Sequence, residues 1–483
     1  MNDFKDISEV YALFAKMDNK ISDLERTVSE QGAEIGRLNR LVDKKDGTIS
    51  RLNSKVVSLE SRLAKYEGPS QDSHNSNTPP SKEPLKSEIV RRTKSLREKS
   101  SRHTGGQKGH KGFTIEMDSE PDFIEKHQAP LFCECCGMPL DDVEAECCGT
   151  YQVVDLPRYR PLTTTHLVYG RKCQCGHVTK GEKPKECGKY VTYGPNIRAL
   201  VSFLSEGHCI PYKRLCEILR DVFGVNISQG SIKNILDKQA EKSKPAYNEI
   251  KERLILEAVI GSDGSGMFVN GDHHWAYAIQ NNRYTYAFQD KSRSKFAIRK
   301  HFPDDFPDSI LVTDRLGTYF QMNVAGHQVC LAHLLRNLQY LTELDKKQTW
   351  SKRVASLLRL SIKKRKTSDF KDITQGYVTR IKSMLNKLLT ESLNNLHEEF
   401  GKLQRGIKRC QKYVFTFLEN PNVPYDNNAS ERAIRVINVK GNVSGCFRSD
   451  KGADDFMILH SIMDTAKKSN NSKFEAMLAI ARL

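Results

Sequence analysis

The sequence predicts a multidomain α+β protein of 483 residues, and three observations indicate this class. Short β-rich runs follow one another between residues 254 and 331. A heptad repeat occupies the N-terminal 67 residues, and Lys/Arg-rich helical patterns fill residues 345–425. A chain of this length exceeds what one hydrophobic core usually holds, so that three or more folded units are expected.

The β-rich stretch predicts three hairpin-linked strands, a helix, a fourth strand, a short connection, a fifth strand and a helix. LILEAVIG at 254–261 is predicted to be a buried strand, and Asn270-Gly271 is typical of a two-residue hairpin turn. HHWAYAIQ and RYTYAFQD follow, then the helical SRSKFAIRKHF, and then two further apolar runs at 309–313 and 327–331. This is the order of an RNase H-like fold with a mixed five-stranded sheet. In that fold the first strand and the end of the fourth lie side by side.

Three acidic residues occupy informative places in this order. Asp263 and Asp314 each follow a β-rich run, and Glu431 lies in the first turn of a predicted helix. Three carboxylates gathered by a sheet and a helix can hold two divalent cations, which is the chemistry of phosphodiester cleavage and transfer. Each acid also has a plainer interpretation. Asp263 fits a turn, Asp314 fits a cap, and Glu431 fits a capping box with Asn428.

Several longer segments resemble transposases of the insertion-sequence-66 family. They are residues 191–236, the two aspartate motifs, CLAHLLRNLQYL and the block from DNNASERAIRVINVKGNVSGCFRS onward, and together the resemblance spans roughly residues 100–483. It implies a DDE transposase that uses Mg²⁺ or Mn²⁺, with Asp263, Asp314 and Glu431 as catalytic residues and metal ligands. It also implies double-stranded DNA, as element ends and target, as the partner. Gly264-Ser265 departs from the Glu or Thr that the family often has after its first Asp.

Residues 1–67 are predicted to form a coiled coil. The a positions are β-branched residues and one leucine, from Ile21 and Val28 to Leu63, while the d positions include Leu24, Leu38 and Leu52. This pattern favours a parallel two-stranded coil, in which the polar d residues Gln31 and Lys45 would fix the register. A single amphipathic helix packed on the body is the alternative. Residues 68–112 follow as a basic linker that we expect to be disordered. Lys108 and Lys111 in its Gly-rich end are candidate DNA contacts.

Residues 113–192 hold a cluster of cysteines. Cys133-x-x-Cys136 and Cys173-x-Cys175 are each followed by glycine, which allows the tight turn of a zinc knuckle. Four thiolates in tetrahedral geometry suit a structural Zn²⁺, and the related transposases have a zinc-binding segment with these two pairs. Free cysteines are the alternative. Neighbouring competitors for the metal are Cys135, Cys147, Cys148, Cys187 and His177.

The remaining units complete the predicted architecture. Residues 193–245 show a helix ending at Gly224 and a second helix capped by Ser228, which is a helix-turn-helix-like layout, although an ordinary αα-hairpin fits as well. Residues 246–344 form the first part of the catalytic core, 345–425 a helical insertion, and 426–483 the C-terminal helix and tail. Cys330 and His333 are interpreted as structural. Further candidate DNA contacts are Lys233, Asn234, Arg432, Arg435, Lys440 and Arg448.

The composition supports a polyanionic partner. Lysine and arginine number 76 against 59 acidic residues, a net charge of +17, which favours nucleic acid over a membrane. Neither a membrane span nor a signal peptide is predicted, and the thirteen cysteines are taken as reduced. We therefore expect the cytoplasm of a prokaryote, with the chain at the nucleoid when it is bound to DNA. We expect at least a dimer, with accessory proteins of the same element as further candidate partners. The competing function is a non-catalytic, zinc-containing DNA-binding regulator dimerised by its coiled coil.

Overall fold

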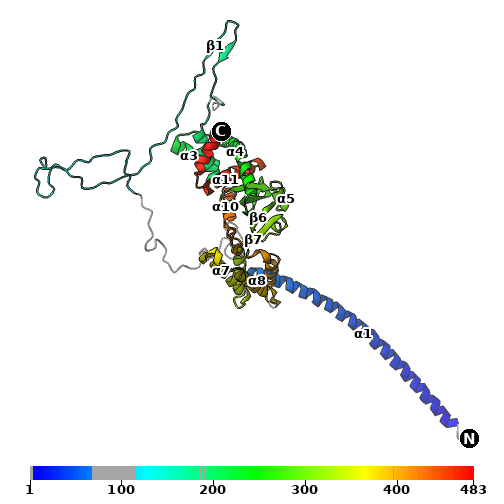
Figure 1. Ribbon diagram of the computed structural model, residues 1–483. Coiled ribbons are helices and arrows are strands. Elements are labelled where there is room, and N and C mark those ends of the chain that lie inside the picture. The colour runs from blue at the N-terminus through cyan, green and yellow to red at the C-terminus, as the bar shows by residue number, and fades with distance from the viewer. Residues whose placement is uncertain (1–3, 68–115, 185–187, 189–190, 395) are drawn as a thin grey trace.

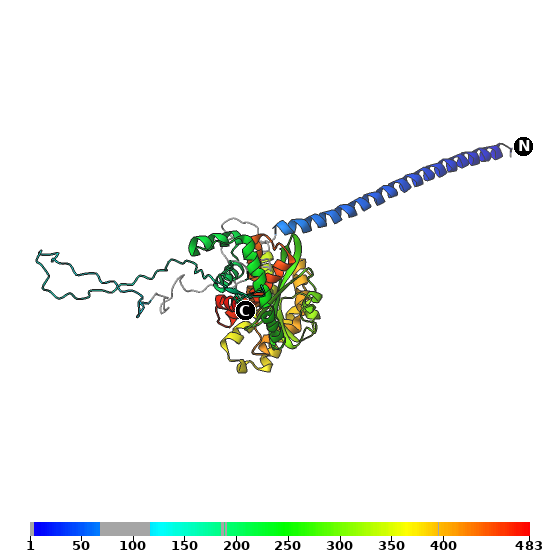
Figure 2. The same cartoon turned by 90° about the horizontal axis from the view of Figure 1, so that it is seen from above.

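The structure is a computed structural model, and it describes residues 4–67, 116–184, 188, 191–394 and 396–483. Helices and one central sheet form a body, from which α1 (Phe4–Glu67) projects as a single long rod (Figures 1 and 2). The C-terminus lies on the body, far from the N-terminus at the free end of α1. The predicted linker, residues 68–112, lies outside the described residues.

The central sheet has five strands in the order β5-β4-β3-β6-β7. They are β3 (Val259–Val269), β4 (Asp272–Gln280), β5 (Thr285–Asp290), β6 (Phe306–Thr313) and β7 (Val324–Val329). β3, β4 and β5 run antiparallel, whereas β6 and β7 run parallel to β3. This mixed sheet is compatible with an RNase H-like core. The predicted neighbourhood of the first and fourth strands is confirmed.

The β3–β4 hairpin forms where the sequence predicts it. Asn270 and Gly271 have φ angles of 50° and 88°, the left-handed pair that a tight primed turn requires, and Val269 faces Asp272 across it. The start of β3 differs from the prediction, because the preceding helix continues to Ile255 and the strand begins at Val259. Asp263 therefore lies inside β3 and not at its end. It stands where β3 loses β6 as a neighbour while it stays paired with β4.

The two faces of the sheet differ in side-chain size. Tyr277 and Phe288 stack on one face, together with residues of the short helix α5 (Lys295–Arg299). The opposite face carries Ala276, Ala278 and Ala287, so that two helices approach closely. These are α10 (Asn428–Ser444), over β3 and β4, and α11 (Asp450–Lys468), over β5. The last helix, α12 (Lys473–Arg482), packs beside α11.

The helical unit before the sheet confirms its predicted caps. It consists of α2 (Pro195–Ser202), the π-helical turn η3 (Phe203–Gly207), α3 (Tyr212–Phe223) and α4 (Gln229–Ile255). Gly224 ends α3 with φ 65°, a left-handed conformation that glycine adopts without strain. The Ser228 hydroxyl accepts the Ser231 amide and so caps α4. Two helices joined by a short turn are thus formed, which is common to the helix-turn-helix-like layout and to an ordinary αα-hairpin.

The predicted helical insertion is also formed. It follows α6 (Leu331–Leu344) and comprises α7 (Trp350–Thr367), α8 (Gln375–Thr390) and α9 (Glu398–Arg409), with the single turns η5 (Phe370–Asp372), η6 (Gln411–Tyr413) and η7 (Thr416–Leu418). A separate turn, η4 (Tyr319–Gln321), precedes β7. A second core joins these helices through Leu338, Trp350 and Phe400, and reaches the sheet at Val329. The insertion is therefore packed against the edge strand β7.

Helix α1 carries its heptad stripe on the surface. Val28 is 65% exposed, Leu24 60% and Ile35 58% in the single chain. A regular row of large apolar side chains in water is unfavourable at roughly 25 cal/mol per Å². The stripe is therefore available to a partner helix. Among the described helices, none is both long enough and apolar enough to cross a membrane.

Candidate active site

The register of the sheet sets Asp263 and Asp314 opposite each other. The parallel pairing of β3 with β6 ends with Gly261 beside Val312, and each aspartate follows two residues later. Asp314 is the first residue after β6, at its carboxyl end, and its carboxylate accepts the Leu316 amide at 3.0 Å. Both aspartates are half-buried. The two carboxyl groups that the sequence singles out thus come from neighbouring strands.

The pKa of Asp263 reflects the other acidic groups near it. Burial raises the pKa of Asp263 to about 7, and the charges of Asp314 and, more weakly, Glu431 add to this rise. Two influences oppose it, namely the hydrogen bond that the Gly264 amide donates to Asp263 and the positive charge of Arg293. Burial also raises the pKa of Asp314. Like charges in a half-buried place destabilise one another unless a cation joins them. The arrangement therefore suits a positively charged ligand.

Helix α10, which carries Glu431, is fastened to β3 beside Asp263. The Asn427 side-chain amide donates to the Ser262 carbonyl at 2.7 Å, and its oxygen accepts the Ser430 hydroxyl at 2.6 Å. Gln280 on β4 in turn donates to the Ser430 hydroxyl at 3.0 Å. All four of these residues are buried, so the network is not weakened by exchange with water. The start of α10 is thereby fixed one residue from Asp263.

Gly261 makes this close approach possible. A Cβ atom at Gly261 would lie 2.6 Å from the Ser430 hydroxyl, 2.7 Å from the Gln280 amide nitrogen and 2.8 Å from the Asn427 oxygen. Those three atoms are the fastening just described, so any side chain would push α10 off the sheet. The glycine is required for space, since its backbone is ordinary strand.

Glu431 does not form the capping box that the sequence offered as an alternative. The N-cap of α10 is Asn427, so Glu431 is the fourth helical residue and not the third. Its amide closes an ordinary helical bond to the Asn427 carbonyl. The carboxylate meets α6 instead, where Arg336 Nη2 lies 3.2 Å and His333 Nε2 3.6 Å from Oε1. The capping interpretation is therefore wrong.

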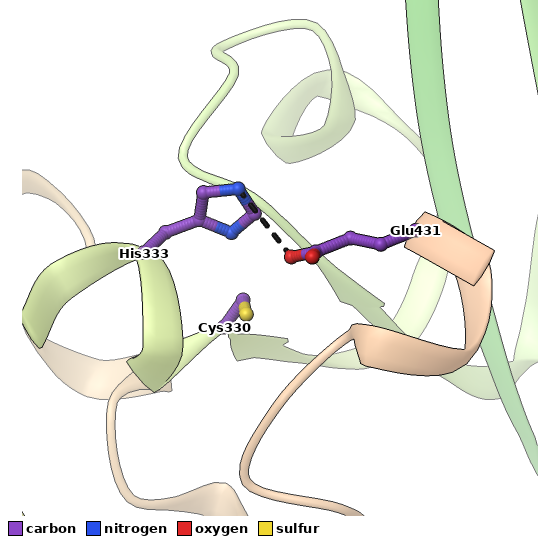
Figure 3. Close-up of side chains that lie close together, drawn as sticks. All are labelled: Cys330, His333 and Glu431. Carbon is purple, nitrogen blue, oxygen red and sulfur yellow. Dashed lines mark ion pairs between the residues drawn. The ribbon is translucent and has the colours of Figure 1, made fainter. Parts of the chain in front are cut away.

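Cys330 and His333 join Glu431 in a compact cluster. Figure 3 shows the three side chains converging from the start of α6 and the start of α10. One donor atom from each lies within 4.8 Å of the other two. The buried Cys330 sulfur accepts the Asn427 amide at 3.2 Å, and burial raises the pKa of its thiol to about 12. Burial, and then Arg336, lower the pKa of His333 to about 3, so its imidazole is neutral.

The four cysteines predicted to bind zinc form two separate turns. Gly137 and Gly176 adopt φ 74° and 87°, and each donates its amide to the first cysteine carbonyl of its pair, as a knuckle requires. Cys173 and Cys175 lie in the turn of a small hairpin of β1 (Gly170–Lys172) and β2 (Val178–Lys180), and this hairpin stands at the far end of an extended loop (Figure 1). Within the described residues these thiols are not gathered into one cluster. The shared zinc site stays a prediction.

The predicted DNA contacts fall into different environments. Lys108 and Lys111 lie outside the described residues. Asn234 is exposed near the start of α4, while Lys233 forms an ion pair with Asp237. Arg432, Arg435 and Arg448 are exposed.

Lys440 corrects the expectation of a surface contact. It is 7% exposed, and its ammonium group bonds the Ser205 carbonyl at 3.0 Å and Glu206 at 3.1 Å in the π-helical turn. A buried charge remains stable only with such a partner. Lys440 therefore links α10 to the helical unit that precedes the sheet.

Sequence reasoning missed the positive groups around the acids. Arg336 lies 95 positions before Glu431 in the chain, so no local pattern connects them. Arg293 lies 4.3 Å over the Trp275 ring and acts on both aspartates. A weak signal for Arg336 existed, since Cys330, His333 and Arg336 recur at intervals of three, along one side of a helix.

The chain matches the model of a known protein family. The family model described as "Transposase IS66 family" matches residues 190–455, which is more than half of the chain. The match begins before α2 and ends within α11, so it includes all five strands of the central sheet and the acids Asp263, Asp314 and Glu431. No curated protein matches the chain.

Proposed function

We propose, from its membership of the IS66 family of transposases, that the chain cuts and joins DNA at the ends of its mobile element. The family assigns a transposase in general. The finer proposal is a divalent-metal centre on Asp263, Asp314 and Glu431. Mg²⁺ or Mn²⁺ would be the ion, because carboxylate oxygens are the ligands that these hard cations prefer.

One geometric observation carries the proposal: β3 and β6 are paired up to two residues before Asp263 and Asp314, and the helix of Glu431 is bonded to β3 at Ser262. The electrostatics agree with it. The pKa of Asp263 is raised to about 7 by burial and by the charges of Asp314 and Glu431, which come from another strand and from a helix. Three carboxyl groups held close together repel one another and so lower the stability of the fold. Such a cost is typical of a functional site, and a bound cation would offset it. When bound, a pair of divalent ions supplies the activation of an attacking oxygen and the stabilisation of a leaving oxygen on phosphorus.

The other residues would hold this site in shape and bind the substrate. Asn427, Ser430 and Gln280 keep the Glu431 helix at a fixed distance from β3. Arg293 and Arg336 lie beside the carboxylates and are suited to contact phosphate oxygens, which they would reach as charge-assisted donors. The exposed Arg432, Arg435 and Arg448 extend a positive surface along α10 and the loop after it.

Double-stranded DNA, as element end and target, would be the partner. The net charge of +17 favours phosphate backbones, and the helix-turn-helix layout offers the exposed start of α4, with Asn234, to a groove. Because the mobile element lies in chromosomal DNA, the chain would act at the nucleoid. A structural Zn²⁺ on the four knuckle cysteines belongs to the same proposal.

The chain would act at least as a dimer through α1. The exposed stripe of Ile21, Val28 and Ile35 at a positions with Leu24 and Leu38 at d positions is the pattern of a parallel two-stranded coil. Light scattering on a fragment of residues 18–66 should report two chains. A fragment that stays monomeric and unfolded at high micromolar concentration would remove the dimer proposal.

A DNA-binding regulator without catalysis is the alternative, and a cleavage assay separates the two. Purified protein is incubated with a labelled fragment that contains an element end and its flanking DNA, with Mg²⁺ or with a chelator. We expect a cut at the element boundary and joined products with Mg²⁺ only. A complex that shifts the fragment in a gel but leaves it intact under both conditions would favour the regulator.

A further inference from the structure

We propose that Cys330, His333 and Glu431 form a second metal site, specific for a thiolate-binding ion of the Zn²⁺ class. An ion there would withdraw Glu431 from the catalytic centre and so inhibit the chain. The binding part of this inference stands without the proposed function. Only the inhibition rests on it.

The backbone places the three donors at two helix starts. Cys330 is the N-cap residue of α6, His333 lies in the first turn of that helix, and Glu431 lies in the first turn of α10. Their donor atoms lie within 4.8 Å of one another. In a tetrahedral zinc site with bonds of 2.0–2.3 Å the donors are separated by roughly 3.3–3.8 Å. A contraction of about 1 Å would bring the three donors to this spacing, and a water molecule would be the fourth ligand.

The sulfur of Cys330 has the surroundings of a ligand. It is buried, and it accepts the Asn427 amide at 3.2 Å, a contact of the kind by which proteins stabilise a metal-bound thiolate. The thiol is protonated in the metal-free chain, so zinc binding must release one proton from it. Mg²⁺ avoids sulfur, and this cluster therefore distinguishes the two ions.

His333 has the protonation state of a metal ligand and a ring nitrogen without a hydrogen bond among the described residues. Its imidazole is neutral, because burial and Arg336 disfavour a second proton. Its Nδ1 atom is buried and has no hydrogen-bond partner among the described residues. An unpaired buried ring nitrogen is costly in a native protein and requires an explanation. A ligand that engages the imidazole would supply one.

Arg336 is the group that opposes metal binding. Its guanidinium lies 3.2 Å from the same Glu431 oxygen and is 18% exposed in its side chain. A zinc ion has to displace this ion pair or share the carboxylate with it. The strength of the Arg336–Glu431 contact would therefore set the zinc concentration at which the site fills.

Zinc counting on the full-length chain tests the site directly. Wild type, Cys330→Ser and Cys410→Ser are dialysed against the same low free Zn²⁺, and bound zinc is measured by atomic emission. We expect Cys330→Ser to hold about one equivalent less than wild type. Cys410→Ser removes another buried cysteine, outside the cluster, and should bind as much as wild type. Equal zinc in wild type and Cys330→Ser would overturn the proposal.

Two further variants keep the outcome interpretable if Cys330→Ser folds poorly. Arg336→Gln removes the competing cation without removing a ligand, so it should bind zinc at least several-fold more tightly. Unchanged or weaker binding would count against the site. Cys136→Ser should lower zinc through the separate knuckle, and its loss should add to that of Cys330→Ser.

The inhibitory consequence has its own readout. Micromolar Zn²⁺ should inhibit Mg²⁺-supported cleavage by wild type, and Arg336→Gln should need less zinc for the same fractional inhibition. A zinc count that matches the proposal with no cleavage by any variant would refute the proposed function and leave the site. Cleavage that is equally insensitive to zinc in both proteins would refute the inhibition.

Discussion

Asp263→Asn and Asp314→Asn are each expected to abolish DNA cleavage and joining. An amide keeps the shape of the carboxyl group but carries no charge to offset two cations at a phosphodiester. The loss of several kcal/mol of transition-state stabilisation corresponds to a fall in rate of about 10³-fold or more. The assay is cleavage of a labelled element end in Mg²⁺. Binding of the same fragment should stay nearly unchanged, because it depends on basic side chains elsewhere.

Exposed acids of the same sheet provide matched controls. Asp272 begins β4 and Asp308 lies on β6, and both are exposed. Asp272→Asn and Asp308→Asn change the net charge by the same amount and should keep activity within about two-fold, as surface substitutions usually do. Full activity of Asp263→Asn or Asp314→Asn would remove that residue from the proposed centre.

Thermal stability gives Asp263→Asn a second readout. The pKa of Asp263 is about 7 in the folded chain and ordinary, near 3.8, in the unfolded chain. The folded state therefore binds the proton more tightly, and the contribution of Asp263 to stability is lost as the pH rises from 3.8 through 7. In the metal-free protein at pH 8, Asp263→Asn should consequently melt no lower than wild type. A markedly lower melting temperature would show that the carboxylate has a structural partner.

Local signals predicted the scaffold well because they act within a few residues. Asn270-Gly271 specifies a hairpin through its left-handed backbone, and Gly224 and Ser228 end and begin helices through their own bonds. The order of strands and helices then leaves few ways to close the sheet. The neighbourhood of β3 and β6 followed from that order, and with it the nearness of Asp263 to Asp314.

The surroundings of the acids could not be predicted, since they depend on contacts between distant segments. Arg336 reaches Glu431 across the whole helical insertion, and Lys440 is buried only because Glu206 lies in a π-helical turn far earlier in the chain. From the sequence alone, a lysine near such a motif is predicted to be exposed, because its buried partner cannot be identified. The end of α4 at Ile255 is a related case, because tertiary packing extended the helix into a run that favours a strand.

Glu431→Gln is the second change for which a nearly complete loss of activity is expected. In the wild-type chain Arg336 lies 3.2 Å from Glu431 Oε1, and a glutamine could still accept a hydrogen bond from it. The glutamine brings no negative charge to the cation site, however. Cleavage should fall by about 10³-fold or more for the same reason as at the aspartates. Stability should change little, because Glu431 is the fourth residue of α10 and caps nothing. Cleavage assays and thermal melts on the same preparation measure both effects.

A glutamate outside the site separates the loss of charge from the loss of catalysis. Glu419 pairs with Lys382 at 2.6 Å on the helical insertion, so Glu419→Gln also breaks an ion pair and should retain activity. Glu431→Asp offers a finer comparison, since it keeps the charge but withdraws it by one methylene from Arg336 and from the aspartates. Partial activity in Glu431→Asp with none in Glu431→Gln would identify charge as the requirement. An active Glu431→Gln protein would instead direct the search for the third carboxylate to Asp426, just before α10, or Asp450, at the start of α11.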